Sequence, residues 1–400
     1  MSIRRVFARP FQLPRTLLAA AGLVGLVGSA VAAGPTQGVS PTEIVIGTTT
    51  DLSGVTAIQG VNNSNAIRMA FDDINAKGGI NGRKIRYVVE DTQYTVPRAV
   101  QGMNKLLNQD HIFLALADGG TPLNQAQLPM QLAKGVPNVF PLTAARSMYE
   151  PFNRLKFGQF ASYYDEMRAA VKYFVEQRHR TKICAMYQDT DFGRDVLAGI
   201  VAEAKALNLP VVATTAHKPT DVEFNADVQK LHDAGCDFIG LGTIVRDTNI
   251  IISTVRKQGW NPDLVGQFAS YDTAVASLPG GAAEGTFCMT PVLYAYPDDP
   301  RPAVQAFAKE YTARFGIAPN FHGEVGYSAA QMVIMALQRA GKDLTTDSFI
   351  TAMEAMHEYT DIFGTTYKLG PDQHHAEAAS FLTVVKNGRW VPVTTEQLAY

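Results

Sequence analysis

The chain has 400 residues, and hydrophobic side chains make up 46% of them. A sequence of this length and hydrophobicity is too long and too apolar for a disordered segment or one small module, and suggests about two or three domains. The 35 basic and 37 acidic residues give a net charge of −2. Because the first 32 residues hold four arginines and no acid, the rest carries 31 basic against 37 acidic residues, a net charge of −6. This mildly acidic balance argues against binding to nucleic acid or to anionic lipid.

The first 32 residues have the pattern of an export signal. Arg4 and Arg5 precede an apolar run from Leu17 to Val27, and Ala30-Val31-Ala32 forms a small-x-small cleavage site. The apolar run is too short to span a bilayer comfortably, and no other apolar stretch approaches about 18 residues. We expect cleavage near Ala32 and a soluble mature chain, with an uncleaved anchor as the alternative. Because the arginine pair partly resembles a twin-arginine signal, the export route stays open.

The three cysteines, Cys184, Cys236 and Cys288, cannot all pair within one chain. Export would place them in an oxidising compartment, where disulfides form. Cys184 and Cys236 both lie in strand-like surroundings. We therefore interpret them as small buried apolar side chains, in preference to a disulfide or a nucleophile.

Beyond the signal, β-rich segments alternate with helical periods. Strands are predicted at 43–50, 85–89, 111–117 and 136–142, and helices at 66–76, 96–107 and 119–135. In the first helix Ile67, Ala70, Phe71 and Ile74 repeat at i, i+3, i+4 and i+7, and glycines follow that can end it. The uninterrupted apolar strand at 111–117 is typical of a parallel sheet covered on both faces.

A second series follows, beginning with a predicted helix at 163–177. Strands are predicted to start near 182, 210, 236 and 263, about 26 to 28 residues apart, which is the length of a strand with its crossover helix. Further helices are predicted at 303–315 and 323–339, and a strand at 381–385. Asn387-Gly388 after that strand is a strong hairpin signal. The simplest architecture is α/β, with two parallel-sheet lobes.

In open α/β sheets, ligands bind beyond the carboxyl ends of the strands, where helix N-termini present free N–H groups. The predicted strands place six segments there: 48–60, 118–121, 142–147, 188–193, 242–247 and 267–272.

No catalytic motif supports an enzyme. The chain lacks a G-x-S-x-G elbow, a phosphate-binding P-loop and an H-E-x-x-H metal motif, and we expect no cofactor and no metal. His374-His375 is interpreted as part of a solvated loop, since adjacent residues do not share a face of a regular element. Asp189, Asp191 and Asp195 suggest a calcium loop or, as the favoured interpretation, helix capping.

Several segments together resemble a known family. They are Glu43–Gly47, Asp51–Gly54, Asp73–Gly82 and Glu90-Asp91, supported by Val136-Pro137, Asp189–Gly193 and Gly259-Trp260. These segments are similar to the periplasmic branched-chain-amino-acid-type, leucine-binding-protein-like solute-binding proteins of ABC importers. The resemblance implies the type I periplasmic binding protein fold, in which two Rossmann-like lobes with parallel central sheets are joined by three crossovers. It places the crossovers near Gln159, Thr290 and Thr365.

The corresponding domain organisation has three parts. Residues 1–32 form the signal peptide. Residues 40–159 plus 291–364 form the N-terminal lobe, and residues 160–290 plus 365–400 form the C-terminal lobe. Each lobe is thus discontinuous in sequence, and the ligand is expected between the two.

The resemblance also implies ligand contacts, at Gln59, Asp118, Gly119, Gly120, Thr121, Leu142, Thr143, Ala144, Phe192, Thr243 and Phe268. Amino-acid binders of this family place serine at the position of Asp118, threonine at that of Ala144 and an acid near Phe268. An aspartate repels a bound carboxylate, and a phenylalanine cannot neutralise a buried ammonium. The side chains that hold an amino acid in this family are therefore not present at the matching positions of this chain. A register slip, or substitution by Glu284, is the alternative.

Aromatic and basic residues near the same loops point to a flat ligand, an aromatic acid or an amide. We add Arg146, Arg246 and Tyr271 to the candidate ligand residues. Tyr163 and Tyr164 are placed at the hinge side of the cleft, with an exposed position after a turn as the alternative. Two of the candidates also have plainer interpretations. Arg246 can pair with Asp247 or Asp272, and Phe192 can be part of the core.

The leading functional hypothesis is a periplasmic receptor that binds a small organic solute and delivers it to an ABC permease in the inner membrane. Ligand binding would favour a closed form of the two lobes, because only that form contacts the ligand from both sides. We expect a monomer without nucleic-acid partners. Alternatives are a conventional branched-chain amino acid carrier, a periplasmic sensor without transport, and an exported enzyme on the same fold.

Overall fold

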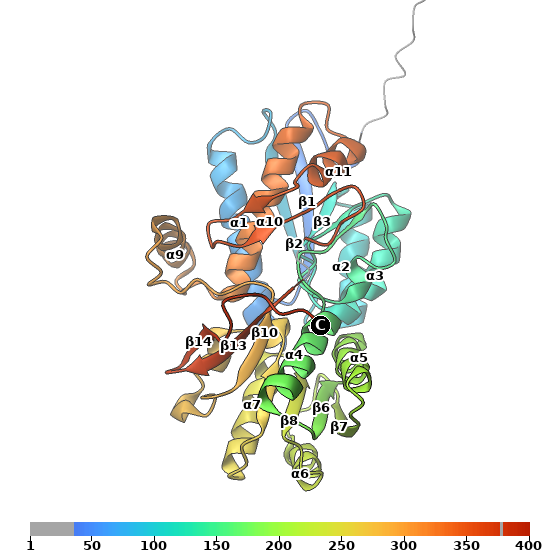
Figure 1. Ribbon diagram of the computed structural model, residues 1–400. Coiled ribbons are helices and arrows are strands. Elements are labelled where there is room, and N and C mark those ends of the chain that lie inside the picture. Colours follow the sequence, from blue (N-terminus) through green and yellow to red (C-terminus); the bar gives the residue numbers. More distant parts are fainter. Residues whose placement is uncertain (1–35, 377–378) are drawn as a thin grey trace, which may run out of the picture. The chain divides into compact units, whose positions relative to one another are not determined.

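A computed structural model describes residues 36–376 and 379–400 (Figure 1). The predicted signal peptide, residues 1–32, lies outside the described residues. No helix in the described part of the chain is long and apolar enough to cross a membrane.

The first lobe is built on a sheet of five parallel strands in the order β2-β1-β3-β4-β5. The strands are β1 (Glu43–Thr50), β2 (Lys84–Asp91), β3 (Leu114–Leu116), β4 (Asn138–Val139) and β5 (Lys156–Phe157). The helices that follow the first three strands in turn are α1 (Ala57–Ala76), α2 (Val96–Asn108) and α3 (Thr121–Ala133). In Figure 1, α1 lies on one side of this sheet, and α2 and α3 lie on the other.

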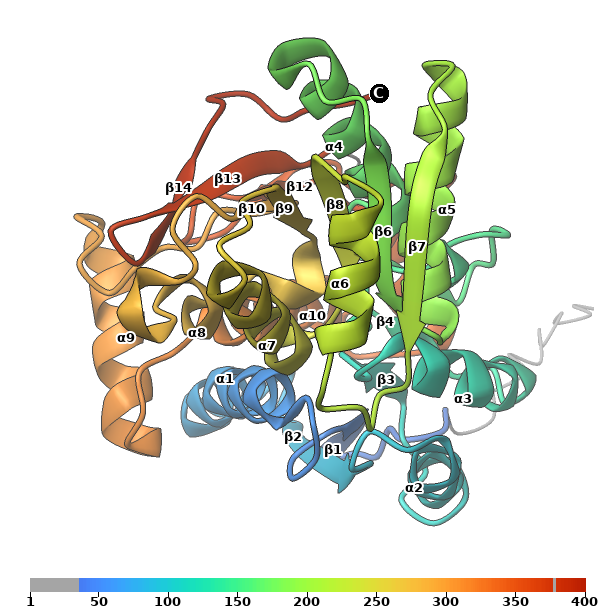
Figure 2. The ribbon, with the colours of Figure 1, turned by 90° about the horizontal axis from the view of Figure 1, so that it is seen from below.

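The second lobe repeats this topology. Its parallel strands run in the order β7-β6-β8-β9-β10, and the antiparallel strands β13 and β14 extend the edge beyond β10. The strands are β6 (Ile183–Gln188), β7 (Val211–His217), β8 (Phe238–Gly242), β9 (Asp263–Gly266), β10 (Phe287–Thr290), β13 (Phe381–Lys386) and β14 (Arg389–Pro392). The helices are α4 (Tyr163–Arg178), α5 (Asp191–Ala206), α6 (Asn225–Asp233), α7 (Val245–Lys257) and α8 (Thr273–Ala276). Figure 2 shows α4 and α5 on one face and α6 and α7 on the other.

Both sheets therefore have the doubly wound order 2-1-3-4-5, in which the order reverses beside the first strand and leaves a crevice at the carboxyl ends. The two crevices are the places where ligands bind in such sheets. The expected α/β fold class, with two lobes and parallel central sheets, is confirmed.

The chain passes between the sheets three times. The first passage lies between β5 and α4, and the second follows β10 and leads into α9 (Pro302–Phe315) and α10 (Phe321–Ala340), which packs on α1. After α11 (Thr346–Glu354) and the small hairpin β11 (Tyr359–Thr360) and β12 (Thr366–Tyr367), the third passage leads to β13. His375 pairs with Gly158 in an isolated β-bridge, and His374 contacts the Lys156 carbonyl, so the chain remains in contact with the segment around β5 as far as residue 375. The third crossover therefore lies later than the position expected near Thr365.

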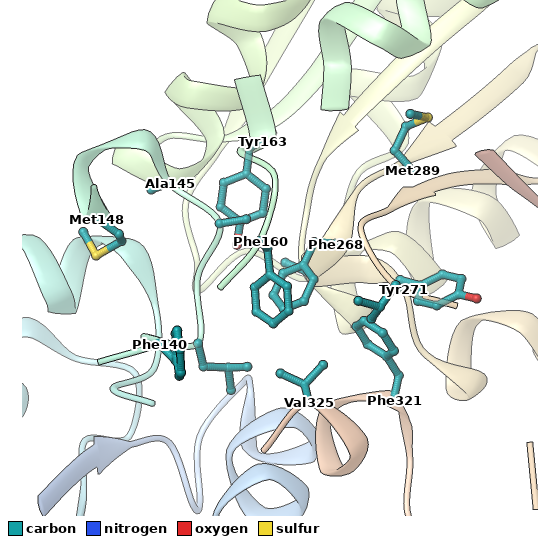
Figure 3. Close-up of a cluster of buried hydrophobic side chains, with 14 of the residues drawn as sticks. Phe140, Ala145, Met148, Phe160, Tyr163, Phe268, Tyr271, Met289, Phe321 and Val325 are labelled. Atoms are coloured by element: carbon teal, nitrogen blue, oxygen red, sulfur yellow. The ribbon is translucent and has the colours of Figure 1, made fainter. Parts of the chain in front are cut away.

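Aromatic rings join the cores of the two lobes. Phe160, from the first passage, stacks on Phe268 with ring centroids 4.5 Å apart. Phe321 at the start of α10 contacts both Phe268 and Tyr271 edge to face, at 5.6 and 4.8 Å. Figure 3 shows these rings side by side, with Tyr163 next to them. Hydrophobic burial at this junction stabilises contact between the lobes.

Most predicted elements are present, and the differences have local causes. The strand predicted at 111–117 is shortened to β3 because His111 and Ala117 adopt φ of 53° and 57°, which breaks the extended backbone at both ends. Phe140, at φ 49°, ends β4 early. The hairpin at Asn387-Gly388 is confirmed, and both residues have the positive φ that a type I′ turn requires.

Helix α1 begins at Ala57, nine residues before the predicted start at Ala66. Its first half is polar, but Asn62 and Asn63 are buried because their side chains bond to the neighbouring helices, Asn62 to the Tyr311 hydroxyl and Asn63 to the His322 carbonyl. Hydrophobic periodicity cannot detect a helical face that is buried through hydrogen bonds.

The interpretation of Cys184 and Cys236 as unpaired residues is wrong. The two cysteines form a disulfide, with Cα atoms 5.9 Å apart, and Cys288 is free and buried. β6 and β8 are neighbours in the sheet although β7 separates them in sequence, and this adjacency brings the two sulfurs together.

Candidate ligand-binding site

A small cavity lies where the carboxyl ends of the two sheets face each other. Its volume is about 20 Å³, room for about one water molecule. The lining residues come from both lobes: Thr56, Gln59, Tyr94, Gly120, Thr121, Leu142, Tyr163, Phe192, Ile244, Phe268 and Ala269. The cavity is thus placed where the strand order predicts a ligand site.

Four helices begin at this cavity. Thr56, Gly120 and Ile244 are the N-cap residues of α1, α3 and α7, and Phe192 is the second residue of α5, whose N-cap is Thr190. The hydroxyls of Thr56 and Thr190 accept no hydrogen bond from their own helices, and the other two N-caps, Gly120 and Ile244, have no side-chain acceptor. Helix N-termini carry partial positive charge and unpaired N–H donors, so their convergence favours an anionic or strongly accepting ligand group.

No lysine, arginine, aspartate or glutamate is among the described residues that line the cavity. Two of its polar side chains are the phenols of Tyr94 and Tyr163. A phenol with the ordinary pKa of 10.0 is neutral at neutral pH, and burial raises the pKa of both further, so both hydroxyls stay protonated. The site is therefore polar without carrying a formal charge of its own.

Aromatic rings form much of the cavity wall. The rings of Tyr163 and Phe192 meet edge to face at 4.9 Å, and the Phe268 ring lies 6.4 Å from that of Tyr163 and 4.5 Å from that of Phe160. Figure 3 shows the rings of Tyr163, Phe160 and Phe268 close to one another. Such walls suit a flat apolar ligand body.

Two hydrogen bonds close the cavity from lobe to lobe. Gln59 Nε2 on α1 donates to the Ala269 carbonyl at 2.6 Å, and the Tyr94 hydroxyl donates to Gln188 Oε1 at 3.4 Å. Ligand pockets usually measure about 300–1,000 Å³, so a ligand can enter only if the lobes separate and these bonds break.

Of the residues predicted to bind ligand, six line the cavity: Gln59, Gly120, Thr121, Leu142, Phe192 and Phe268. Tyr163, predicted at the hinge, also lines it. The other predicted residues lie behind the wall or outside it.

Asp118 is the most informative of the residues behind the wall. Its side chain has 0% exposure, and its carboxylate accepts from the Thr49 backbone N–H at 2.7 Å, from the Thr49 hydroxyl, and from Gln131 Nε2 at 2.8 Å. Burial raises the pKa of Asp118 to about 7, although these hydrogen bonds act in the opposite direction. Asp118 thus ties β1 to α3 beneath the cavity.

Four more predicted residues act as supports. Gly119 pairs with Leu142 in an isolated bridge, and the Thr143 hydroxyl bonds to Thr121 at 2.6 Å. The Ala144 carbonyl accepts from the Tyr163 N–H at 2.9 Å. The Thr243 hydroxyl bonds to Thr248 at 2.6 Å.

The two predicted arginines do not line the cavity. Arg146 pairs with Asp195 of the other lobe at 2.9 Å, and its guanidinium lies 3.8 Å from the ring centre of Tyr164, the second predicted hinge residue. Arg246 pairs with Asp247 and also donates to the Pro219 carbonyl at 2.8 Å.

Tyr271 and Glu284 also have structural partners. Tyr271 is buried against Phe321, and its hydroxyl accepts from the Tyr294 N–H at 3.4 Å. The Glu284 carboxylate accepts from the N–H groups of the β13–β14 turn at 3.0 and 2.7 Å, so it does not replace the missing acid at the cavity.

Sequence reasoning missed Thr56, Tyr94, Ile244 and Ala269 as lining residues. Thr56, Ile244 and Ala269 fall within the predicted loops but offer no distinctive chemistry. Tyr94 lies in the loop after the second strand, which we did not select. Its sequence signal is a tyrosine in a loop at the carboxyl end of β2, where ligand-binding residues are expected in such sheets.

The interpretation of His374-His375 as part of a solvated loop is wrong. His374 is 3% exposed and stacks on Phe157 at 4.0 Å, and His375 stacks on Tyr149 at 4.0 Å, so neither lies in a solvated loop. No group of three or more potential metal ligands occurs within 36–376 and 379–400.

The favoured helix-capping role of the three aspartates is also wrong. Thr190, not an aspartate, is the N-cap of α5, while Asp189 pairs with Arg194 at 2.8 Å and Asp195 pairs with Arg146. Asp189 and Asp195 thus form ion pairs in place of the expected capping bonds.

Two doubly wound lobes that face each other across a cavity define a two-lobed ligand-binding protein. The model of the family described as periplasmic binding protein matches residues 43–389, and the chain belongs to this family. It is thereby a periplasmic-type solute-binding protein, and the resemblance read from the sequence motifs is confirmed. The relatives are solute-binding proteins rather than enzymes.

Similar proteins bind different solutes. The leucine-specific-binding protein of Salmonella typhimurium is 24% identical over 377 residues, covering 90% of this chain and 98% of that protein. A branched-chain amino acid ABC transporter structure from Thermus thermophilus with bound valine has a TM-score of 0.81 at 19% identity, covering 90% and 97% of the two chains. A solute-binding protein of an ABC transporter from R. palustris, in complex with benzoate, has a TM-score of 0.78 at 18% identity, covering 89% and 97%. At these identities the structures establish the fold alone.

Proposed function

We propose that this protein is the periplasmic receptor of an ABC importer and binds a small aromatic acid, or the corresponding amide, in the cavity between its lobes. One observation carries the choice of ligand: four helix N-termini and four aromatic rings surround a cavity whose described lining contains no acidic side chain. The helix ends favour a carboxylate or an amide oxygen, and the rings favour a flat apolar body.

An α-amino acid fits this cavity poorly. Its ammonium group would be buried among Tyr163, Phe192 and Phe268 without a carboxylate partner, which costs several kcal/mol. The conventional function, transport of branched-chain amino acids, is supported by the name of the Salmonella relative but lacks that partner at this site. The benzoate complex of the R. palustris protein shows that this fold accommodates an aromatic acid.

The lobes would close around the ligand by population shift. In the closed arrangement described here, Gln59 and Ala269 already bond across the cavity, so the polar atoms of this pair become available to a ligand when the lobes separate. The donor and the acceptor of this pair match an amide, while the helix N-termini match a carboxylate. We expect a monomer that delivers the loaded form to a membrane permease, with the lobes closed on the ligand but farther apart than in the arrangement described here, whose cavity of about 20 Å³ holds only about one water.

A thermal-shift screen of the refolded, ligand-free protein tests this proposal. Benzoate, benzamide and L-leucine are compared at millimolar concentration, because a ligand at about 1,000 times its Kd stabilises the native state by about 4 kcal/mol. We expect stabilisation by benzoate or benzamide and none by L-leucine. Stabilisation by L-leucine alone, with a Kd tighter than about 10 μM, would refute the proposed ligand class.

A further inference from the structure

The loop that carries Tyr94 has an unusual backbone. Gln93 and Tyr94, between β2 and α2, have φ of 48° and 54°, a region that bulky side chains rarely adopt. Hydrogen bonds hold the turn: the Gln93 N–H donates to Asp91 Oδ1 at 3.0 Å, and the Tyr94 N–H donates to Thr92 Oγ1 at 3.3 Å. The surroundings thus fix the direction in which the Tyr94 side chain leaves the loop.

The Tyr94 ring crosses from the first lobe to the second beside the cavity. It lines the cavity, and its hydroxyl reaches Gln188 at the end of β6. The ring also lies against Gly120, where an added Cβ would stand 2.8 Å from a ring carbon. A glycine at the N-terminus of α3 therefore leaves the space that the ring occupies.

The Gln188 carboxamide has an incomplete set of hydrogen bonds. Gln188 is 0% exposed, and its Oε1 accepts from the Tyr94 hydroxyl at 3.4 Å and from the Thr190 hydroxyl at 3.2 Å. Its Nε2 is buried and has no hydrogen-bond partner among the described residues. A buried donor without a partner destabilises the protein unless another molecule supplies an acceptor.

We propose that Tyr94, which lines the cavity, and Gln188, which it bonds, form a specificity gate beside the cavity. When the lobes close on a ligand, the Gln188 amide donates to an oxygen of that ligand, while the Tyr94 hydroxyl holds the carboxamide in position. This inference rests on the proposed function and deepens it: the ligand must present an acceptor oxygen, as a carboxylate or an amide does. A cation of the same shape supplies only donors and is rejected.

A purely structural role makes a different prediction. If the pair only packs the two lobes together, removing the carboxamide changes stability and leaves the ranking of ligands unchanged. If it is a gate, the same change lowers the affinity for carboxylates and amides and reduces the discrimination against cations. The readout is therefore the ratio of affinities, measured alongside the melting temperature.

The test compares Tyr94→Phe and Gln188→Leu with the wild-type protein. Tyr87→Phe is the matched control, because the Tyr87 hydroxyl bonds to Thr48 at 2.9 Å within the first lobe. Isothermal titration calorimetry measures the Kd for benzoate, benzamide and benzylamine. We expect Gln188→Leu to weaken benzoate and benzamide at least tenfold without lowering the melting temperature, Tyr94→Phe to weaken them about threefold to tenfold, and Tyr87→Phe to leave them unchanged.

The double variant adds a further check. Because the two side chains act as one unit, Tyr94→Phe combined with Gln188→Leu should weaken benzoate no more than Gln188→Leu alone. Suppose that the wild type binds benzoate or benzamide and that both single variants bind it with a Kd within twofold of the wild-type value. This result would overturn the gate and leave the proposed function standing. A wild-type protein that binds neither benzoate nor benzamide would overturn the proposed function, and the gate with it.

Discussion

Replacing Asp118 by asparagine should remove part of the pH dependence of folding. Asp118 is fully buried behind the cavity wall, and burial raises the pKa of its carboxyl group to about 7 from the ordinary value of 3.8. Between these two values the native state keeps a proton that the unfolded state has released. Stability linked to Asp118 is therefore present at acidic pH and is lost as the pH rises through about 7.

The size of this effect follows from the two pKa values. A tenfold difference in proton affinity corresponds to about 1.4 kcal/mol, so the contribution of Asp118 should fall by roughly 2 to 3 kcal/mol between pH 5 and pH 8. Burial also raises the pKa of Glu166 and Glu324, which gives a slope of the same sign. The pH dependence from Glu166 and Glu324 is present in the wild type and in Asp118→Asn alike, so it cancels when the two are compared.

Urea unfolding at pH 5, 6, 7 and 8 measures the difference. The free energy of unfolding of the wild type should fall relative to that of Asp118→Asn across this range, whatever constant cost the amide imposes. Asp347→Asn is the control, because the Asp347 side chain is 86% exposed and should leave the slope unchanged. Parallel pH curves for the wild type and Asp118→Asn would refute the argument that the buried carboxyl is protonated in the native state.

Three further changes have defined outcomes. Reduction of the Cys184–Cys236 disulfide, 52 residues apart in sequence, should lower the free energy of unfolding by about 4 kcal/mol, measured by urea unfolding with and without reductant; an unchanged value would contradict the bond. Phe192→Ala should weaken the preferred aromatic ligand by about 1–3 kcal/mol in calorimetry, because the ring lines the cavity, and equal affinity would place the ligand elsewhere. Arg146→Ala should weaken binding by less than about tenfold, because Arg146 holds Asp195 of the other lobe rather than the ligand; complete loss of binding would show direct contact.

Much of the fold was predictable because parallel sheets leave a strong local signal. The apolar strand cores and their regular spacing predicted both sheets, and Asn387-Gly388 predicted the hairpin that adds β13 and β14 to the second sheet. The limits of β3 and β4 were not predictable, since they depend on positive φ at residues such as His111 and Phe140 that have no glycine-like sequence signal.

The candidate site was predictable at the level of loops and less so for single side chains. Carboxyl ends of strands predicted the right region, and residues such as Phe192 and Phe268 line the cavity. The charged residues predicted to contact the ligand do not line the cavity. The sequence does not show which side chain or backbone group each of them binds in the folded protein. Asp118 accepts a hydrogen bond from Thr49 beneath the cavity, and Arg146 forms an ion pair with Asp195 of the other lobe.

The most direct test of the account is a crystal structure of the protein with the tightest-binding compound of the thermal-shift screen. We predict that the ligand ring lies between the lobes against Phe192 and Phe268, with its oxygen atoms within hydrogen-bond distance of the N–H groups at the start of α3. No acidic side chain should contact the ligand. A ligand bound outside the cavity, or an ammonium group paired with a carboxylate inside it, would contradict the account.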